Sequence, residues 1–146
     1  MREVVLHVGT HKTGSSSIQE ALEGFDDGRT IYSSLGVNHS APMATIFRKD
    51  ASNYVIWKRS GLSVEEISQK REKFIATLNA ELDCPSRERL IVSAEGLSIL
   101  DYDEKRALIE YISAKGCKIS VVAYVRDPLS FVGSSVMEKI RGEPPT

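Results

Sequence analysis

A glycine- and serine-rich segment at residues 9–17 carries the residue types best suited to bind an anion. Its sequence is Gly-Thr-His-Lys-Thr-Gly-Ser-Ser-Ser, and it lies between an apolar segment, 3–8, and a segment of helical periodicity. In a strand–loop–helix unit, loop amides and the helix N-terminus direct several N–H donors at one point, where the helix dipole favours an anion. Lys12 adds a positive charge and the serines add hydroxyl donors. The segment predicts a phosphate-binding loop, and the alternative is a tight turn capped by serine.

The spacing of this loop differs from that of a magnesium-dependent nucleotide triphosphatase. Gly9 and Gly14 have the spacing of a Walker A motif, but Ser15 occupies the position of its lysine. The lysine of this chain, Lys12, precedes the second glycine instead. No hydrophobic segment ends in a clear magnesium-binding aspartate. We therefore expect no metal here, and a P-loop small-molecule kinase, which needs one, is a less favoured alternative.

A second group of polar residues follows the apolar segment 118–125. Arg126 comes directly after that segment, and Ser134 follows Arg126 by eight residues, inside a predicted helix. An arginine can fork onto phosphate oxygens, and a helix serine can donate a further hydrogen bond. The alternatives are an arginine paired with a surface carboxylate and a serine that faces solvent. At this spacing we favour a second anion site.

Together the two segments resemble the nucleotide-binding motifs of PAPS-dependent sulfotransferases, especially bacterial ones (PAPS is 3′-phosphoadenosine 5′-phosphosulfate). Residues 7–19 resemble the 5′-phosphosulfate loop with its Lys-Thr-Gly core, and residues 121–134 resemble the 3′-phosphate motif. The resemblance extends from residue 4 to about residue 138 and is loose in the middle. It implies a P-loop-like nucleotide fold, PAPS as co-substrate and the desulfated nucleotide PAP as product. The residues that it assigns to the nucleotide are Lys12, Thr13, Gly14, Ser15, Ser16, Ser17, Arg126 and Ser134.

Sulfuryl transfer is an in-line displacement in which the catalyst mainly positions groups and stabilises charge. Lys12 is the candidate for stabilising the leaving phosphate. The acceptor hydroxyl or amine also needs a base, for which Glu95, His11 and His39 compete. Glu95 follows a predicted strand and should share the sheet edge with the loop. His11 neighbours Lys12, and His39 is expected to line the acceptor pocket. Cytosolic members of the family have a histidine near the position of Glu95, whereas other branches use glutamate.

Several properties stay open at this point. A non-catalytic nucleotide- or phosphate-binding module is an alternative from a different class. The acceptor, a small molecule or a carbohydrate, is not indicated, and neither is the oligomeric state. Family members have a lid after the 3′-phosphate helix, and this chain ends at Thr146. We expect either a naturally short enzyme or a fragment of a longer one, which folds but transfers sulfate poorly.

Composition excludes several other classes of protein. The chain has 146 residues with 19 Lys and Arg against 20 Asp and Glu, and a net charge of −1. This balance argues against a sequence-blind nucleic-acid binder, which needs a broad basic face.

No apolar run approaches the ~18 residues of a membrane span. The N-terminus is too short for the apolar core of a signal peptide. Cys84 and Cys117 lack metal-ligand spacing, and we expect reduced thiols in a cytoplasmic protein.

The elements that position these residues follow from apolar periodicity. Apolar segments predict strands at 3–8, 30–32, 89–94 and 118–125. Predicted helices pass through Ile18, Ala21, Leu22 and Phe25, begin with capping boxes at Ser63 and Asp101, and begin at Asp127. Residues 29–62 are the hardest to interpret, with a short strand, a loop and one or two short helices expected. The predicted fold class is α/β: one three-layer domain with a mainly parallel sheet of about four strands and helices on both faces.

Overall fold

The computed structural model describes residues 2–9, 14–125 and 127–140. Within them four strands form one parallel sheet, in the order β2-β3-β1-β4. The strands are β1 (Glu3–Gly9), β2 (Thr30–Tyr32), β3 (Arg89–Ser93) and β4 (Lys118–Tyr124). In register, Glu3 of β1 aligns with Arg89 of β3 and with Lys118 of β4. The carboxyl ends of the strands therefore meet at one edge of the sheet.

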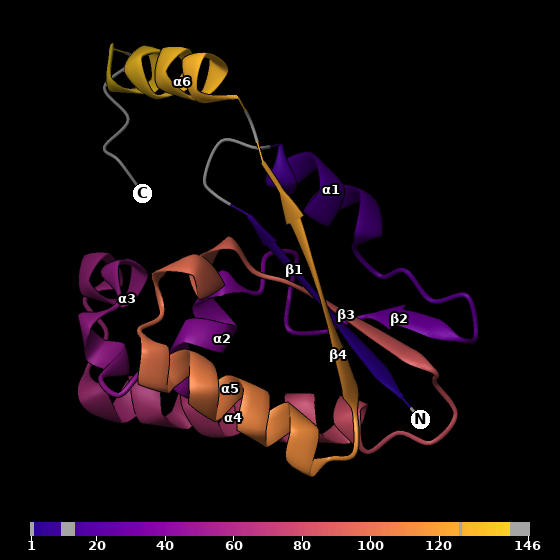
Figure 1. The fold of residues 1–146 in the computed structure, drawn as a ribbon. Helices are drawn as coiled ribbons and strands as arrows, with labels where there is room; N and C mark the ends of the chain where they lie inside the picture. Colours follow the sequence, from indigo (N-terminus) through magenta and orange to yellow (C-terminus); the bar gives the residue numbers. More distant parts are fainter. Residues whose placement is uncertain (1, 10–13, 126, 141–146) are drawn as a thin grey trace.

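Helices connect the strands along the chain (Figure 1). They are α1 (Ser15–Leu22), α2 (Ser40–Phe47), α3 (Val55–Ser60), α4 (Val64–Leu82), α5 (Tyr102–Ala114) and α6 (Pro128–Ile140). Two short 3-10 helices, η1 (Ala51–Asn53) and η2 (Glu95–Ile99), lie among them. Parallel pairing needs crossover connections of this kind, because a tight hairpin cannot return the chain in the same direction. The α/β class and the four-strand parallel sheet are those predicted from the sequence.

Different helices cover the two faces of the sheet. Leu6 and His7 are neighbours on β1, and their side chains therefore point to opposite faces. Leu6 belongs to the main hydrophobic core, which includes residues of α2, α4 and α5. His7 lies on the other face, in a hydrogen-bonded group with Ser93 and with Gln19 of α1. Figure 1 shows the same division, with α1 apart from α2, α4 and α5.

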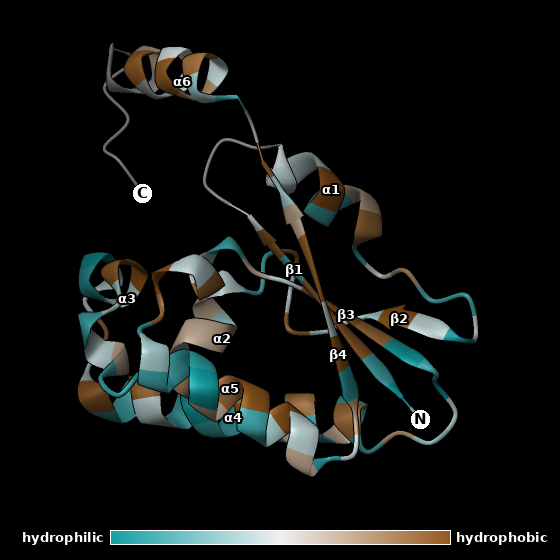
Figure 2. Ribbon diagram, in the orientation of Figure 1, coloured by the Kyte–Doolittle hydropathy of each residue, from teal (hydrophilic) through white to brown (hydrophobic). Residues whose placement is uncertain are grey.

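The main core is made of aliphatic and aromatic side chains from the inner strands and the three helices that face them. Its deeply buried members include Val4, Leu6, Met43, Leu78, Leu90, Val92, Leu108 and Ile112. Full burial of one such side chain contributes roughly 1.5–3 kcal/mol. Figure 2 shows hydrophobic residues along β1, β3 and β4, and hydrophobic and hydrophilic residues alternating along the helices. The sheet and the helices α2, α4 and α5 therefore form one packed body.

Both predicted capping boxes are confirmed. The Ser63 hydroxyl accepts from the Glu66 N–H at 3.2 Å, and the Glu66 carboxylate accepts from the Ser63 N–H at 2.8 Å. The equivalent distances for Asp101 and Glu104 are 2.8 and 3.0 Å. Each box satisfies N–H groups that the first helical turn leaves without an intrahelical partner. Local sequence therefore sets where α4 and α5 begin.

The outer strand β4 is more exposed than its sequence suggests. An unbroken apolar run is typical of a buried strand, but Val121, Val122 and Tyr124 are exposed, and Val125 is 85% exposed. Within the described part of the chain, β4 pairs only with β1. Helix α6 lies apart from the other helices (Figure 1), and its Leu129 is also 85% exposed. An apolar strand is buried only where neighbours cover it, and the described neighbours of β4 leave these side chains uncovered.

Other sequence expectations are met with small differences. Residues 29–62 contain β2, α2, η1 and α3, in agreement with a short strand and short helices. Helix α1 ends at Leu22, before Phe25, and Gly24 adopts a φ of +71°, a left-handed conformation that ends a helix. Cys84 and Cys117 are free thiols. Among the helices that the structure describes, none has both the length and the apolar character needed to cross a bilayer.

Candidate functional site

At the carboxyl edge of the sheet, the start of α1 meets the residue that follows β3. Glu95 lies just after β3 and is buried. Ser15, the first residue of α1, is also buried, and its hydroxyl donates a hydrogen bond to Oε1 of Glu95. The partial positive charge of the α1 N-terminus also favours a carboxylate in this place. The start of α1 and the end of β3, 80 residues apart in sequence, are therefore joined directly.

The residues at the start of α1 have different environments. Gly14 precedes the helix with a φ of +83°, and a Cβ on it would meet nothing within 4 Å. Its requirement for glycine is therefore conformational rather than steric. Ser15 is buried against Glu95, whereas Ser16 and Ser17 are exposed. Of the three serines, Ser16 and Ser17 have hydroxyls on the surface of α1.

A buried polar group lies beneath this edge, on the α1 face of the sheet. His7 Nδ1 is 2.7 Å from Ser93 Oγ, and the Gln19 amide donates to the same oxygen at 3.1 Å. His7 and Ser93 are paired neighbours on β1 and β3. Gln19 is four residues after Ser15 and so faces the sheet on the same side of α1. Ser15 and Gln19 thus fix α1 to β3 through polar contacts.

His39 has a structural position. It is fully buried, its Nδ1 accepts from the Ser93 N–H at 2.9 Å, and its Nε2 lies 2.7 Å from the Gly36 carbonyl and 3.1 Å from that of Ser33. Because the backbone N–H can only donate, the ring is neutral with its proton on Nε2. His39 therefore ties the segment after β2 to the end of β3. Its ring has no exposed surface, so contact with an acceptor remains only a sequence prediction.

Burial dominates the electrostatics of both described histidines. Removal from water lowers the pKa of His7, and the negative charge of Glu95 opposes that change. Burial likewise lowers the pKa of His39, while its hydrogen bonds to the Gly36 and Ser33 carbonyls oppose it. Both imidazoles are therefore neutral at pH 7. The pKa of Tyr54 is raised by burial, with Arg48 opposing this and Glu95 adding to it.

Four of the predicted site residues, His11, Lys12, Thr13 and Arg126, lie outside the described residues. Ser134 lies in α6 and is half-buried, and its hydroxyl makes no hydrogen bond within the described part of the chain. The described residues thus join Glu95 with Ser15. They give no contact between this pair and Ser134.

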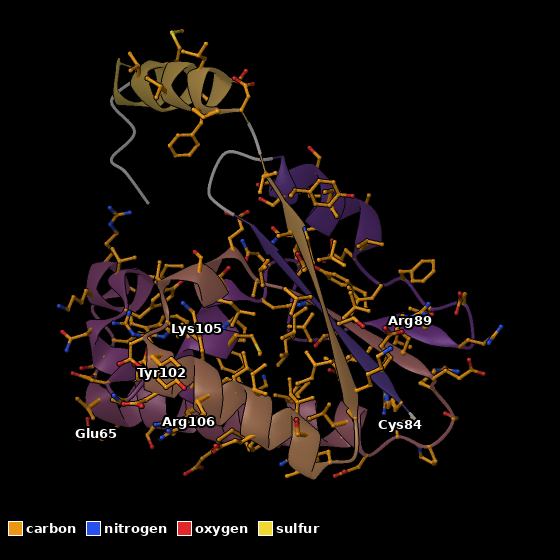
Figure 3. All side chains as sticks on the ribbon, viewed as in Figure 1. Glu65, Cys84, Arg89, Tyr102, Lys105 and Arg106 are labelled. Atoms are coloured by element: carbon orange, nitrogen blue, oxygen red, sulfur yellow. The ribbon has the colours of Figure 1, made fainter. Side chains whose placement is uncertain are left out.

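Two surface cavities lie away from the Ser15–Glu95 contact. A cavity of about 370 Å³ opens beside the end of β2 and is lined by Phe25, Tyr32, Ser34 and Glu81 among others. A cavity of about 430 Å³ lies at the amino end of the sheet, where Arg89, labelled in Figure 3, pairs with Glu3 at 2.8 Å. Arg29 and Glu88 form a further ion pair there. The second cavity is lined by these two ion pairs and by Asp27, so its lining has one more negative than positive charge.

Sequence reasoning missed the group formed by His7, Gln19 and Ser93. A histidine within the apolar segment 3–8 is a signal that could have been followed, because a buried imidazole needs hydrogen-bond partners. Ser93 is the last residue of a second buried strand, and Gln19 is four residues after Ser15. Their alignment depends on the β3–β1 pairing, which the sequence alone does not specify.

The described donor groups suit an anion or an acceptor hydroxyl better than a metal. Hydroxyl and backbone N–H groups cluster at the start of α1, and Glu95 is the carboxylate nearest to them in the hydrogen-bond network. Among the residues with a described position, no three His, Cys, Asp or Glu side chains gather as a metal site would require. The sequence matches no protein-family model and no curated protein.

Proposed function

We propose that this chain is a sulfotransferase that binds PAPS at the carboxyl edge of its sheet and transfers the sulfuryl group to a hydroxyl or amine acceptor. The contact between Ser15 and Glu95 carries the proposal. It joins the end of the predicted phosphosulfate loop to the predicted base, which lie in separate parts of the sequence. Open parallel sheets bind ligands at this edge.

The residues have distinct proposed roles. Loop amides and the α1 N-terminus hold the 5′-phosphosulfate, and Arg126 with Ser134 binds the 3′-phosphate. The acceptor oxygen or nitrogen attacks sulfur as the bond from sulfur to the bridging oxygen breaks, and PAP leaves. Lys12 stabilises the charge that develops on that oxygen. Glu95 takes the acceptor proton, and its hydrogen bond from Ser15 fixes the position of the carboxylate.

Equilibrium titration tests the nucleotide part of this proposal. PAP should bind without magnesium, and ATP, which lacks the 3′-phosphate, should bind more weakly. Lys12→Ala and Arg126→Ala should each weaken PAP binding by ~1.5–3 kcal/mol, which is the contribution of a charge-assisted contact. Arg126→Ala should remove the preference for a 3′-phosphate, whereas Lys12→Ala should weaken nucleotides with and without one.

Matched controls use charges outside the two motifs. Lys73→Ala on the exposed side of α4 and Arg106→Ala on α5 should leave PAP affinity within about twofold, since exposed single charges contribute little at a distance. A magnesium-dependent preference for ATP would favour the kinase alternative. An equal loss of 3′-phosphate preference in Lys12→Ala and Arg126→Ala would contradict separate anion sites.

Glu95→Gln tests the base. It retains the size of the side chain and an oxygen that accepts from Ser15, but it removes basicity. We expect turnover to fall ~10²-fold or more with PAP affinity nearly unchanged. Unchanged turnover would transfer the role to His11. PAP binding with no turnover of any acceptor would favour the non-catalytic binding module.

A further inference from the structure

His7 contains a buried polar atom without a partner. The residue is 5% exposed, and no side chain or backbone group that the structure describes forms a hydrogen bond with its Nε2. Native proteins pair nearly all buried polar atoms, so an unpaired one calls for an explanation, such as a site for a bound molecule. His7 lies two residues before the end of β1, where the predicted phosphate loop begins. Its unpaired atom is therefore close in the chain to the candidate site.

The contacts of Ser93 indicate which ring nitrogen carries the proton. The Gln19 amide nitrogen can only donate, so Ser93 Oγ accepts from it at 3.1 Å. The Ser93 hydroxyl has one proton to donate, either to His7 Nδ1, 2.7 Å away, or to the Tyr32 hydroxyl, with which it also forms a hydrogen bond. If Nδ1 accepts this proton, the imidazole proton must be on Nε2. The ring is then a neutral donor whose orientation is fixed by its contact with Ser93.

The surroundings of His7 place this donor between β3 and β4. The ring meets Tyr124 of β4 edge-on, with centroids 5.4 Å apart and planes at 86°. The charge of Glu95 acts on the imidazole from the end of β3. A neutral, buried N–H in this position can bind an oxygen of a tetrahedral anion without adding a charge that would have to be desolvated.

We propose that His7, held by Ser93 as the Nε2–H tautomer, is a positioning residue that donates a hydrogen bond to an oxygen of a sulfuryl or phosphoryl group bound after β1. The inference rests on the proposed anion site and adds to it a neutral donor that the motifs do not contain. His7 orients the group, while the charges of the loop attract it.

Nitrogen NMR of the intact chain tests the tautomer directly. The chain has three histidines, so each ¹⁵N-labelled imidazole resonance can be assigned by substituting one histidine at a time and noting which resonance disappears. His39 is the internal reference, because its backbone contacts require the Nε2–H form. We expect His7 to show the same tautomer, and its Nε2 resonance to shift when inorganic sulfate or PAP is added. A His7 proton on Nδ1, or an Nε2 resonance unchanged at saturation, overturns the inference.

Two substitutions at His7 separate the two ring nitrogens. The amide nitrogen of Gln reaches the position of Nε2, whereas Asn reaches only that of Nδ1. His7→Gln should keep PAP and sulfate affinity within about threefold, and His7→Asn should weaken both by about tenfold, the value of one hydrogen bond. Ser93→Ala should leave a mixture of tautomers in the NMR spectrum. The measurement on the unsubstituted chain still decides the question if a variant does not fold.

The outcomes distinguish this inference from the proposed function. Sulfate binding with a His7 response but without PAP binding would support the positioning role and refute the PAPS proposal. PAP binding that is equal in His7→Gln and His7→Asn would refute the positioning role alone. Binding of neither probe would refute both.

Discussion

The inner strands, β1 and β3, and the outer flank, formed by β4 and α6, both contain apolar runs but have opposite environments. Val4 in β1 and Val121 in β4 both belong to apolar runs, yet Val4 is fully buried and Val121 is 61% exposed. β1 has a paired strand on each side, whereas β4 pairs only with β1 within the described residues. The inner strands therefore enclose polar groups in fixed contacts, while the flank exposes apolar ones. Pairing alone does not decide burial, because β2 also pairs with a single strand and yet Thr30 and Tyr32 are buried; the elements that cover each strand decide it.

The largest contrast between the two regions should come from removing His39. His39→Ala leaves a cavity and unpairs the Ser93 N–H and the Gly36 carbonyl. We expect the free energy of unfolding to fall by about 3 kcal/mol or more, measured by urea denaturation. Leu129→Ala in α6, at an 85% exposed position, should change it by no more than about 0.5 kcal/mol. Equal losses would mean that the flank is as firmly packed as the inner strands.

Replacement by alanine should change the free energy of unfolding in opposite directions at two glycines, Gly96 and Gly133. A Cβ on Gly96 would lie 2.9 Å from Ser40 Cβ, so Gly96→Ala should cost about 1–3 kcal/mol through overpacking. A Cβ on Gly133, in α6, would meet nothing within 4 Å, and Gly133→Ala should stabilise the helix by about 0.5–1 kcal/mol. Urea denaturation of each variant, compared with the unsubstituted chain, measures both changes in the free energy of unfolding. Destabilisation by both would contradict an open environment for α6.

Mild acid should affect the inner region first, through its neutral histidines. Burial lowers the pKa of His7 and of His39 below the value of 6.5 for an unperturbed side chain. The unfolded chain therefore binds more protons in acid, and this contribution to stability, complete above pH 6.5, is lost progressively as the pH falls from that value towards the pKa values of the folded state. The slope is at most about 1.4 kcal/mol per pH unit for each histidine. Unfolding measured from about pH 7.5 to 5.5 should show this loss, with a smaller slope in His7→Gln. A flat profile would mean that protonation is tolerated.

The smallest effect is expected at the exposed end of the flank. Val125→Lys places a charge at a position that is 85% exposed, so stability should change by no more than about 0.5 kcal/mol. Binding of a hydrophobic dye should decrease, because an exposed apolar side chain is lost. A loss above about 1.5 kcal/mol that depends on protein concentration would show that a second copy buries this position.

The predictable part of the fold was local. The capping boxes at Ser63 and Asp101 set the starts of α4 and α5, because their hydrogen bonds join residues three apart. Edge geometry brought Glu95 near the loop, since parallel strands end together. The hydrogen bond between Ser93 and His7 depends on strand pairing across 86 residues, and sequence patterns do not determine that pairing. The exposure of β4 depends on what lies beside it, and the burial of His39 on a loop that folds back onto β3.

The strand order of the sheet, β2-β3-β1-β4, has a consequence for synthesis on the ribosome. β1 is made first but occupies the centre of the sheet, and its partner β3 follows 86 residues later, from Glu3 to Arg89. At ~5–20 residues per second, β1 waits roughly 4–17 s before Arg89 is added. During that interval Val4, Val5 and Leu6 have no strand beside them. The nascent chain therefore exposes an aggregation-prone segment that a holding chaperone would be expected to cover until β3 emerges.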